Sequence, residues 1–361
     1  MYKSYLPIFF TLLFFSCKEK NQKKYSSSDS LIKYSGRFEQ ISDTTTALIS
    51  SAAAAEFTVK GDSVNVYVQS DNTTRNYFVI SINDEYQKRY KLEGNTVEKI
   101  TLKLPKKESN KIGVFKATEA FSGTIIFHGI DAFDLVSTDK KPFLIEFIGN
   151  SITCGALADN SDIDCNNGEY IDQHNAYLAY GPRLARTLNA DYRLSSVSGI
   201  GMYRNWNNES LEEPIMPKVY ENLYLNTDDS KKYDFKSQPN IVSICLGTND
   251  MSDGDGIKER LPFNEEKYTK NYIDFVETIY QKYPKTKIIL INSPMVSGEK
   301  NTILISCLKN VQQHFKEKEI KLFEFDTLYV NGCNYHPSIQ DHKEMASKLL
   351  PLFSEVLDEK S

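Results

Sequence analysis

A serine at position 151 follows an apolar segment that ends in Gly149-Asn150, a setting that suits a nucleophilic hydroxyl. Residues 143–148 have the pattern of a short buried strand, and a glycine after such a strand lets the backbone turn sharply without a Cβ clash. A serine presented on that turn can attack a carbonyl carbon when a nearby base removes its proton. The alternative is a serine that only caps the next helix. The choice depends on whether a base and oxyanion donors occur elsewhere in the chain.

His336, in the segment Asn334-Tyr335-His336-Pro337, is the best candidate for that base. A histidine held in a loop by a following proline can reach a serine near another strand and accept its proton. His342, six residues later, is the rival candidate. The other histidines are better explained as surface or packing residues: His128, His174 and His314.

Two further loops could supply oxyanion donors. Gly199 lies in the small-residue segment 195–201, and Asn249 lies in Leu246-Gly247-Thr248-Asn249-Asp250, after the most apolar strand in the chain. The backbone N–H groups of Ser151 and Gly199 and the amide of Asn249 would then point to one oxygen. Each signal is weak alone, because glycine loops are common and an Asn often closes a local turn.

From Pro142 onward, apolar strands alternate with helical stretches. This alternation predicts an α/β domain with a parallel sheet covered by helices on both faces. Functional residues in such sheets gather beyond the carboxyl ends of the strands, which places the candidates at one edge. The expected strands are 143–148, 192–195, 241–246, 288–292 and 322–325, and the expected helices are 176–188, 268–283, 302–317 and 339–350.

Residues 31–136 instead show apolar side chains at every second position. Turn signals such as Lys60-Gly61-Asp62 separate these runs at the spacing of a β-sandwich or jelly roll, so we predict an all-β first domain. The alanine run 52–55 is compatible with a helix or with the edge of a strand. The alternating positions are Val64, Val66 and Val68, then Phe78, Ile80 and Ile82, then Ile112 and Val114, and finally Ile125 and Phe127.

The N-terminus has the features of an export signal. Residues 1–17 combine Lys3, an apolar run too short to span a membrane, and Ser16-Cys17. The pattern resembles a bacterial lipoprotein signal, in which Cys17 is acylated after cleavage. We therefore expect secretion across the inner membrane and a lipid anchor in the cell envelope, on the periplasmic side or at the cell surface. The polar residues 18–30 are expected to form a flexible tether.

Composition sets limits on size and partners. The chain has 361 residues, 40% apolar and 25% charged, which is enough for two domains with their own cores. The net charge of −5 is spread along the chain, and the one dense basic cluster is residues 18–24, so nucleic acid is not an expected partner. A small or neutral substrate suits this balance better.

Cysteines and acidic residues do not predict a metal site. No cysteine pair has Cys-x-x-Cys spacing, and the aspartate-rich loop 250–256 lacks EF-hand spacing, so we interpret it as a solvated turn and expect no metal or organic cofactor. Cys154 and Cys165 are close enough in sequence to bridge one loop, but sequence does not establish the pair. Cys245, within an apolar strand, is expected to be buried.

Taken in order, Ser151, Gly199, Asn249 and His336 resemble the serine, glycine, asparagine and histidine blocks of the SGNH hydrolases over residues 142–358. Gly149–Gly155, residues 198–207, Gly247–Asp250 and His336-Pro337-Ser338 are more narrowly similar to carbohydrate esterase family two. The resemblance implies a flavodoxin-like three-layer α/β/α domain preceded by a jelly roll at 31–136. It also implies removal of acetyl groups from polysaccharides such as xylan or glucomannan through an acetyl-enzyme, with Ser151 as nucleophile and His336 as base.

The chain departs from the SGNH pattern beside the histidine. Many members have an aspartate two or three residues before it, whereas this chain has Asn334 and Cys333. The resemblance therefore implies a Ser-His dyad in which a backbone carbonyl or Asn334 holds the imidazole. Replacing the orienting aspartate of a serine protease by asparagine lowers the rate about 10⁴-fold, which shows how much this group can matter. Trp206 and Tyr335 flank the expected site and could stack on a sugar ring or pack between loop and sheet.

Two other functions remain compatible with the sequence. The missing carboxylate would suit a non-catalytic glycan-binding lipoprotein. An esterase or lipase for other acyl esters would keep the same chemistry, although the polar loop 159–173 offers little apolar surface for a long acyl chain.

Overall fold

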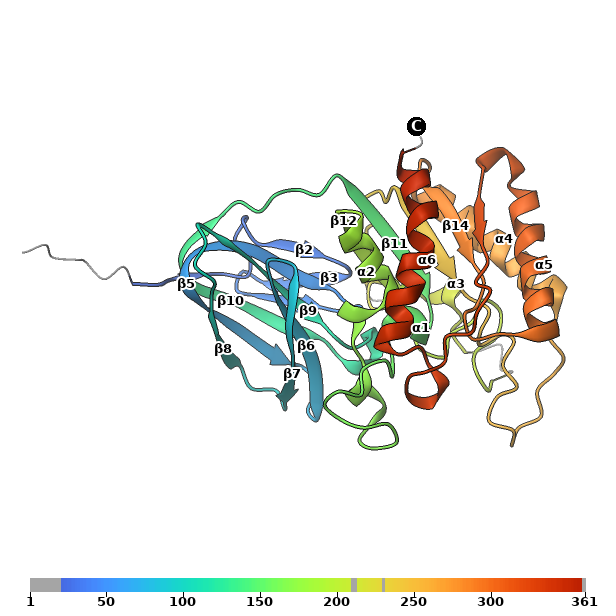
Figure 1. The fold of residues 1–361 in the computed structure, drawn as a ribbon, viewed down its shortest axis with the longest axis horizontal. Coiled ribbons are helices and arrows are strands. Elements are labelled where there is room, and N and C mark those ends of the chain that lie inside the picture. Colours follow the sequence, from blue (N-terminus) through green and yellow to red (C-terminus); the bar gives the residue numbers. More distant parts are fainter. Residues whose placement is uncertain (1–20, 209–212, 229–230, 359–361) are drawn as a thin grey trace, which may run out of the picture.

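The computed structural model describes residues 21–208, 213–228 and 231–358. Its first part is an antiparallel β-sandwich, on the left of Figure 1, and its second part is an α/β domain with a parallel sheet. Both halves of the predicted fold class are confirmed. The sandwich contains β1 (Lys23–Tyr25), β2 (Lys33–Ser35), β3 (Phe38–Ser42), β4 (Thr45–Leu48), β5 (Ala54–Ser70), β6 (Arg75–Ile82), β7 (Glu85–Glu93), β8 (Glu98–Lys103), β9 (Asn110–Lys116) and β10 (Ile125–Val136).

The sandwich core is built from the alternating positions. All ten side chains expected to face inward are buried, most of them completely. The long strand β5 pairs with β9 through Ala54–Val59 and with β8 through Ser63–Val68, so the two halves of one strand hold different partners. The alanine run 52–55 leads into β5 and is not helical, because alanine packs closely there and its helix propensity does not decide the structure.

The prediction of a flexible tether at residues 18–30 is wrong for the part that the structure describes, which begins at residue 21. β1 pairs with β10 in the antiparallel register Lys23↔Ala132 to Tyr25↔Ile130, so these residues add a strand to the sandwich. Backbone pairing supplied a contact that the polar composition of residues 18–30 did not indicate. The predicted signal segment 1–17, with Cys17, lies outside the described residues. Within the described ranges, no helix is both long and apolar enough to cross a membrane.

The second domain has five parallel strands in the order β12-β11-β13-β14-β15. This is the flavodoxin-like 2-1-3-4-5 order, in which the crossover direction reverses between the first and third strands. The strands are β11 (Phe143–Gly149), β12 (Ala190–Ser196), β13 (Ile241–Cys245), β14 (Lys287–Ile291) and β15 (Lys321–Phe323), and each overlaps its predicted segment.

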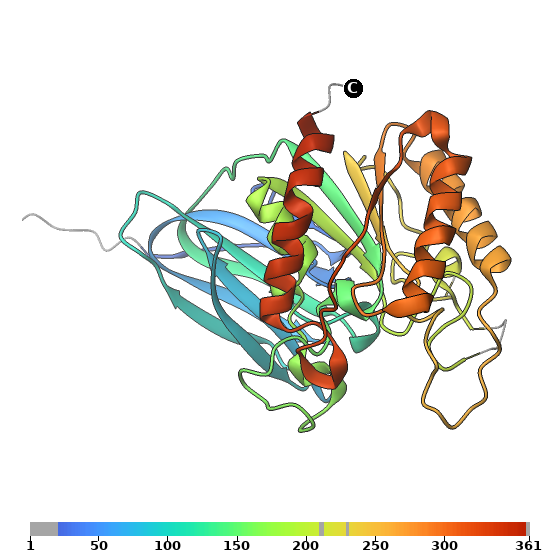
Figure 2. The same cartoon turned by 45° about the vertical axis from the view of Figure 1, so that its right-hand side comes forward.

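Helices cover both faces of this sheet, and Figure 2 shows α6 and the α4–α5 pair on opposite sides of it. The predicted helix 176–188 is interrupted: a 3₁₀ turn covers Ala176–Leu178, and α2 begins only at Tyr180. The helices are α1 (Ser151–Cys154), α2 (Tyr180–Thr187), α3 (Met216–Val219), α4 (Glu265–Lys282), α5 (Gly298–His314) and α6 (Ile339–Asp358).

One hydrophobic core joins the two domains. The cluster between the sheet and helices α2 and α6 includes Phe147, Tyr180 and Phe353, and it continues into Tyr77 and Phe115 of the sandwich. The sandwich therefore packs directly against the α/β domain, and the two share buried apolar surface.

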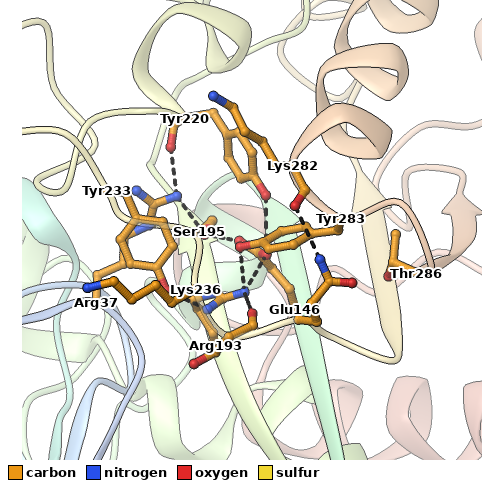
Figure 3. A network of polar contacts seen from close by, with 12 residues as sticks. Arg37, Glu146, Arg193, Ser195, Tyr220, Tyr233, Lys236, Lys282, Tyr283 and Thr286 are labelled. Carbon is orange, nitrogen blue, oxygen red and sulfur yellow. Dashed lines mark hydrogen bonds and ion pairs between the residues drawn. The ribbon is translucent and has the colours of Figure 1, made fainter.

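A buried polar network reinforces this contact (Figure 3). The Arg37 guanidinium, from the loop before β3, donates to Ser195 Oγ at 3.1 Å and to the Tyr220 carbonyl at 2.8 Å. Ser195 Oγ donates to Glu146 Oε1 at 2.6 Å, and Arg193 donates to Glu146 Oε2 at 2.9 Å. The network thus links the first domain to the centres of β11 and β12.

Charge balance holds the network together. Burial opposes ionisation of Glu146, but Arg193 and Arg37 outweigh burial and lower the pKa of its carboxyl. Arg37 also lies over the ring of Tyr233, with 4.4 Å between the guanidinium carbon and the ring centroid. Because Arg37 is fully buried, removing it would leave hydrogen-bond acceptors unpaired in a dry environment.

Arg37→Met is expected to lower the free energy of unfolding by about 3–5 kcal/mol, the usual cost of removing one partner from a buried charge network. Denaturant unfolding followed by circular dichroism measures this loss. Lys103→Met, at an exposed position in β8, is the matched control and should change stability by less than about 0.5 kcal/mol. Equal stabilities of the two variants would contradict this role for the network.

Candidate active site

Ser151 is the first residue of α1, directly beyond the carboxyl end of β11. Asn150 caps this short helix by accepting a hydrogen bond from the Ile152 N–H at 3.1 Å. A Cβ on Gly149 would come within 2.0 Å of Thr153 Oγ1, so the glycine is required by close packing. Ser151 is only 7% exposed, and its hydroxyl lies at a cavity.

His336 is in contact with that hydroxyl. Its Nε2 lies 3.0 Å from Ser151 Oγ, and its Nδ1 lies 3.1 Å from the backbone carbonyl of Asn334. Because a carbonyl oxygen can only accept, Nδ1 must carry the proton, and Nε2 of the neutral ring is left to accept from the serine. The Asn334 backbone, one of the two groups expected to hold the imidazole, therefore fixes the tautomer that a base needs.

The surroundings of His336 favour its neutral form. Burial lowers the pKa of the imidazole below its ordinary value of 6.5, and the hydrogen bond to the Asn334 carbonyl opposes this effect in part. A neutral imidazole beside a serine hydroxyl is ready to accept a proton at pH 7.

The loop that carries His336 has an unusual backbone. Asn334 and Tyr335 both have positive φ, 48° and 59°, and this conformation is costly for a residue such as tyrosine. A disulfide joins Cys333 to Cys165, and the Cys333 N–H donates to the Leu157 carbonyl at 3.0 Å. The loop is therefore tied to the segment that follows the candidate nucleophile.

The disulfide differs from the sequence-based possibility. Cys154 does not pair with Cys165: it is a buried free thiol whose Sγ lies 3.2 Å from Ser196 Oγ. Cys165 instead bonds across 168 residues of sequence, a pairing that cysteine spacing cannot reveal. Cys245 is buried as expected.

Asp341, in the first turn of α6, holds the His336 loop by hydrogen bonds to its backbone. Its carboxylate accepts from the Asn331 N–H and the Ser338 N–H, both at 2.9 Å. Residues on both sides of His336 are thereby fixed to the start of α6. Sequence analysis did not identify this aspartate, although an acidic residue three positions after Ser338 is a typical helix-start signal.

Ser151, Gly199, Asn249 and His336 line one cavity of about 740 Å³. Gly199 has φ 74°, and its carbonyl accepts from the Trp206 N–H at 2.8 Å, which fixes the turn. The Asn249 amide donates to the Ile200 carbonyl at 2.7 Å, so its orientation is set by the glycine loop itself. The four residues that the sequence singled out are thus brought together.

The two predicted aromatic residues lie at the rim of this cavity. Trp206 is 49% exposed and Tyr335 is 77% exposed, so neither is a packing residue. Sequence analysis missed two other aromatic side chains that line the cavity: Phe121, 60% exposed and contributed by the sandwich domain, and Tyr170. No sequence signal predicted Phe121 at the cavity, because this residue reaches it only when the two domains pack together.

The rival base is excluded by its position. His342 is fully buried, and its Nδ1 accepts from the Tyr180 N–H at 3.2 Å. Burial lowers the pKa of His342 to about 3. His174, one of the histidines interpreted as surface or packing residues, is also fully buried and contacts Glu119 of the first domain at 3.1 Å.

The aspartate-rich loop does not form an acidic cluster in the described residues. Asp250 turns inward and accepts from the N–H groups of Met202 and Tyr203 at 3.0 and 2.8 Å. Asp253 pairs with Lys300 at 2.5 Å. Among the described residues, no group of three or more His, Cys, Asp or Glu side chains is placed to hold a metal ion.

Together these groups can carry out acyl transfer. A serine hydroxyl contacts a neutral imidazole, the imidazole tautomer is fixed, and Gly199 and Asn249 line the same cavity. This arrangement combines a nucleophile, a base and candidate oxyanion donors.

Comparisons with known proteins assign each domain. Residues 34–137 match the family model for the carbohydrate esterase 2 N-terminal domain. Residues 147–318 match the model for the GDSL-like lipase/acylhydrolase family.

Relatives with both domains are similar along most of the chain. An acetylxylan esterase/glucomannan deacetylase from Cellvibrio japonicus is 27% identical over 305 residues, which cover 82% of this chain and 81% of the relative. A family two carbohydrate esterase from Clostridium thermocellum, solved in complex with cellohexaose, has a TM-score of 0.78 at 25% identity and covers 90% of this chain and 99% of its own. One from Cellvibrio japonicus has a TM-score of 0.82 at 21% identity, covering 93% and 98%.

The two family models occur in the order of the two domains, and the solved relatives share the whole arrangement. The chain thus combines a domain that matches the carbohydrate esterase 2 N-terminal model with a GDSL-like hydrolase domain, in the two-domain arrangement of the family two carbohydrate esterases, and it is a serine ester hydrolase.

Proposed function

We propose that this protein removes O-acetyl groups from polysaccharides or oligosaccharides such as xylan or glucomannan, using Ser151 and His336. The observation that carries the proposal is the 3.0 Å contact between Ser151 Oγ and His336 Nε2 in a cavity lined by Gly199 and Asn249.

The reaction follows from this geometry. Ser151 Oγ attacks the acetyl carbonyl carbon while His336 Nε2 accepts the hydroxyl proton. The N–H groups of Ser151 and Gly199 and the Asn249 amide stabilise the oxyanion. The C–O bond to the sugar then breaks, and His336 returns the proton to the leaving sugar hydroxyl. A water molecule, activated by His336, hydrolyses the acetyl-enzyme and releases acetate.

Two features support a carbohydrate as the alcohol part of the ester. Trp206 and Tyr335 present exposed rings at the rim of the cavity, and a sugar ring can stack on such faces. The relatives named above are an acetylxylan esterase/glucomannan deacetylase and a family two esterase in complex with cellohexaose.

The decisive experiment measures acetate release from acetylated xylan and acetylated glucomannan by the protein without its predicted signal. The parent should release acetate and hydrolyse aryl acetates, whereas Ser151→Ala should lower both rates at least about 10³-fold because the nucleophile is lost. Activity on aryl esters should fall steeply from acetate to butyrate.

Three outcomes would contradict parts of this proposal. Retained activity in a folded Ser151→Ala variant would show that Ser151 is not the nucleophile. A preference for butyrate would favour an esterase for other acyl groups. If Trp206→Ala slows polysaccharide deacetylation no more than aryl acetate hydrolysis, sugar stacking on Trp206 is wrong.

The disulfide supports a second prediction. Cys165→Ser is expected to lower kcat for aryl acetates about ten- to hundredfold with little change in KM, because the loop that places His336 loses its covalent tie. Reduction of the parent should have the same effect. Cys307→Ala, which removes a buried cysteine outside any disulfide, is the control and should keep the parental kcat. Full activity after the bond is shown to be open would contradict this role.

We also propose that Cys17 carries a lipid that anchors the enzyme in the cell envelope. When the full chain is expressed in a bacterium supplied with labelled palmitate, the parent should be labelled and sediment with membranes. Cys17→Ala should be unlabelled. An unlabelled parent protein would show that the segment is only an export signal.

A further inference from the structure

Glu119, from the sandwich domain, reaches beneath the catalytic cavity. It lies between β9 and the 3₁₀ turn Ala120–Ser122 and is fully buried. Its Oε2 accepts from the Ser198 N–H, and its Oε1 accepts from Ser198 Oγ, both at 2.6 Å. Ser198 directly precedes Gly199, so both carboxylate oxygens hold the turn that presents the Gly199 N–H.

The same carboxylate contacts two other parts of the site. His174 Nε2 lies 3.1 Å from Oε1, and Cys154 Sγ, in the helix that begins at Ser151, lies 3.6 Å from Oε2. Tyr170, which lines the cavity, donates to Ser198 Oγ at 2.8 Å, so the Ser198 hydroxyl proton is directed to Glu119. The donors around Glu119 suit an ionised carboxylate, which can only accept.

Two basic groups lie beside this carboxylate, and neither carries a full positive charge at pH 7. Among the described residues, His174 Nδ1 is buried without a hydrogen-bond partner. A doubly protonated His174 would therefore bury an unpaired N–H, whereas a neutral ring that donates from Nε2 avoids this cost. Lys116 donates from Nζ to the Glu119 backbone carbonyl, and burial lowers the pKa of this lysine to about 7.

Glu119 also acts on the base. Burial lowers the pKa of the His336 imidazole, while Coulomb attraction from Glu119 acts in the opposite direction and raises it. Glu119 thus favours the imidazolium that forms when His336 accepts the serine proton. An orienting aspartate both fixes the imidazole tautomer and stabilises the imidazolium by its negative charge. The backbone carbonyl of Asn334 fixes the tautomer but carries no full charge, so it cannot supply the second effect.

We propose that Glu119 is a positioning residue of the esterase site, which holds the Ser198–Gly199 turn for oxyanion binding and supplies the buried negative charge that stabilises the His336 imidazolium. This inference rests on the proposed Ser151–His336 mechanism. It gives the first domain a part in shaping the site.

The test compares Glu119→Gln with the parent in aryl acetate hydrolysis across pH. The expected result is a fall in kcat of about tenfold or more with KM within about twofold, and a shift of the acid limb of kcat/KM to lower pH. The limb should move because it reports the pKa of free-enzyme His336, which Glu119 raises. Glu56→Gln removes a sandwich carboxylate that pairs with Lys111 away from the cavity, and it should match the parent.

The outcomes separate this inference from the function on which it rests. An active parent with an inactive Ser151→Ala variant establishes the esterase first. An unchanged kcat in Glu119→Gln, or a lower kcat with an unmoved acid limb, would then overturn the role of Glu119. If the glutamine variant does not fold, Glu119→Asp keeps the charge but shortens its reach, so it should lower kcat and leave the acid limb in place. An unaltered kcat in that variant would equally contradict the inference.

Discussion

The hydrogen bond between His336 Nδ1 and the Asn334 carbonyl determines what the rest of the site must provide. A backbone carbonyl can fix the imidazole tautomer only if the backbone itself is fixed. Here that backbone includes two consecutive residues with positive φ, a conformation that persists only when its surroundings enforce it. The disulfide at Cys333 and the Asp341 carboxylate supply this constraint from opposite ends of the loop. A carboxylate side chain would orient the imidazole by its own rotamer. A backbone carbonyl can do so only in a loop whose conformation is fixed, so the His336 loop needs covalent and tertiary support.

The sequence predicted the fold, and it singled out four residues that the structure brings to one cavity; the physical reason for both is local. Buried parallel strands appear in a sequence as short apolar segments. Each candidate residue directly follows such a strand or precedes a helix. Because β11 and β13 are neighbours in the sheet, the segments after them had to meet, as the positions of Ser151 and Asn249 show. The strands of the sandwich could be predicted in the same way, because one face of each strand is buried and apolar residues therefore alternate with polar ones.

The features that sequence analysis missed depend on contacts between distant segments. The partner of Cys165 lies 168 residues away, and spacing along the chain carries no information about such a pair. β1 forms from polar residues because β10 offers a pairing edge. Glu119 and Phe121 belong to a domain whose sequence shows only a sandwich, and their place at the cavity appears only when the domains pack together.

Two side chains of the first domain hold the end of β12 and the segment after it. Arg37 of the first domain donates to Ser195, and Glu119 of the same domain accepts from Ser198, three residues later. The segment that ends in Gly199 is thus held at two points by side chains from outside the α/β domain. A glycine loop has little stiffness of its own, because glycine restricts the backbone least. A glycine block whose signal in the sequence is weak alone thus depends for its geometry on the neighbouring domain, and for this reason the sandwich is best regarded as part of the unit that forms the candidate site.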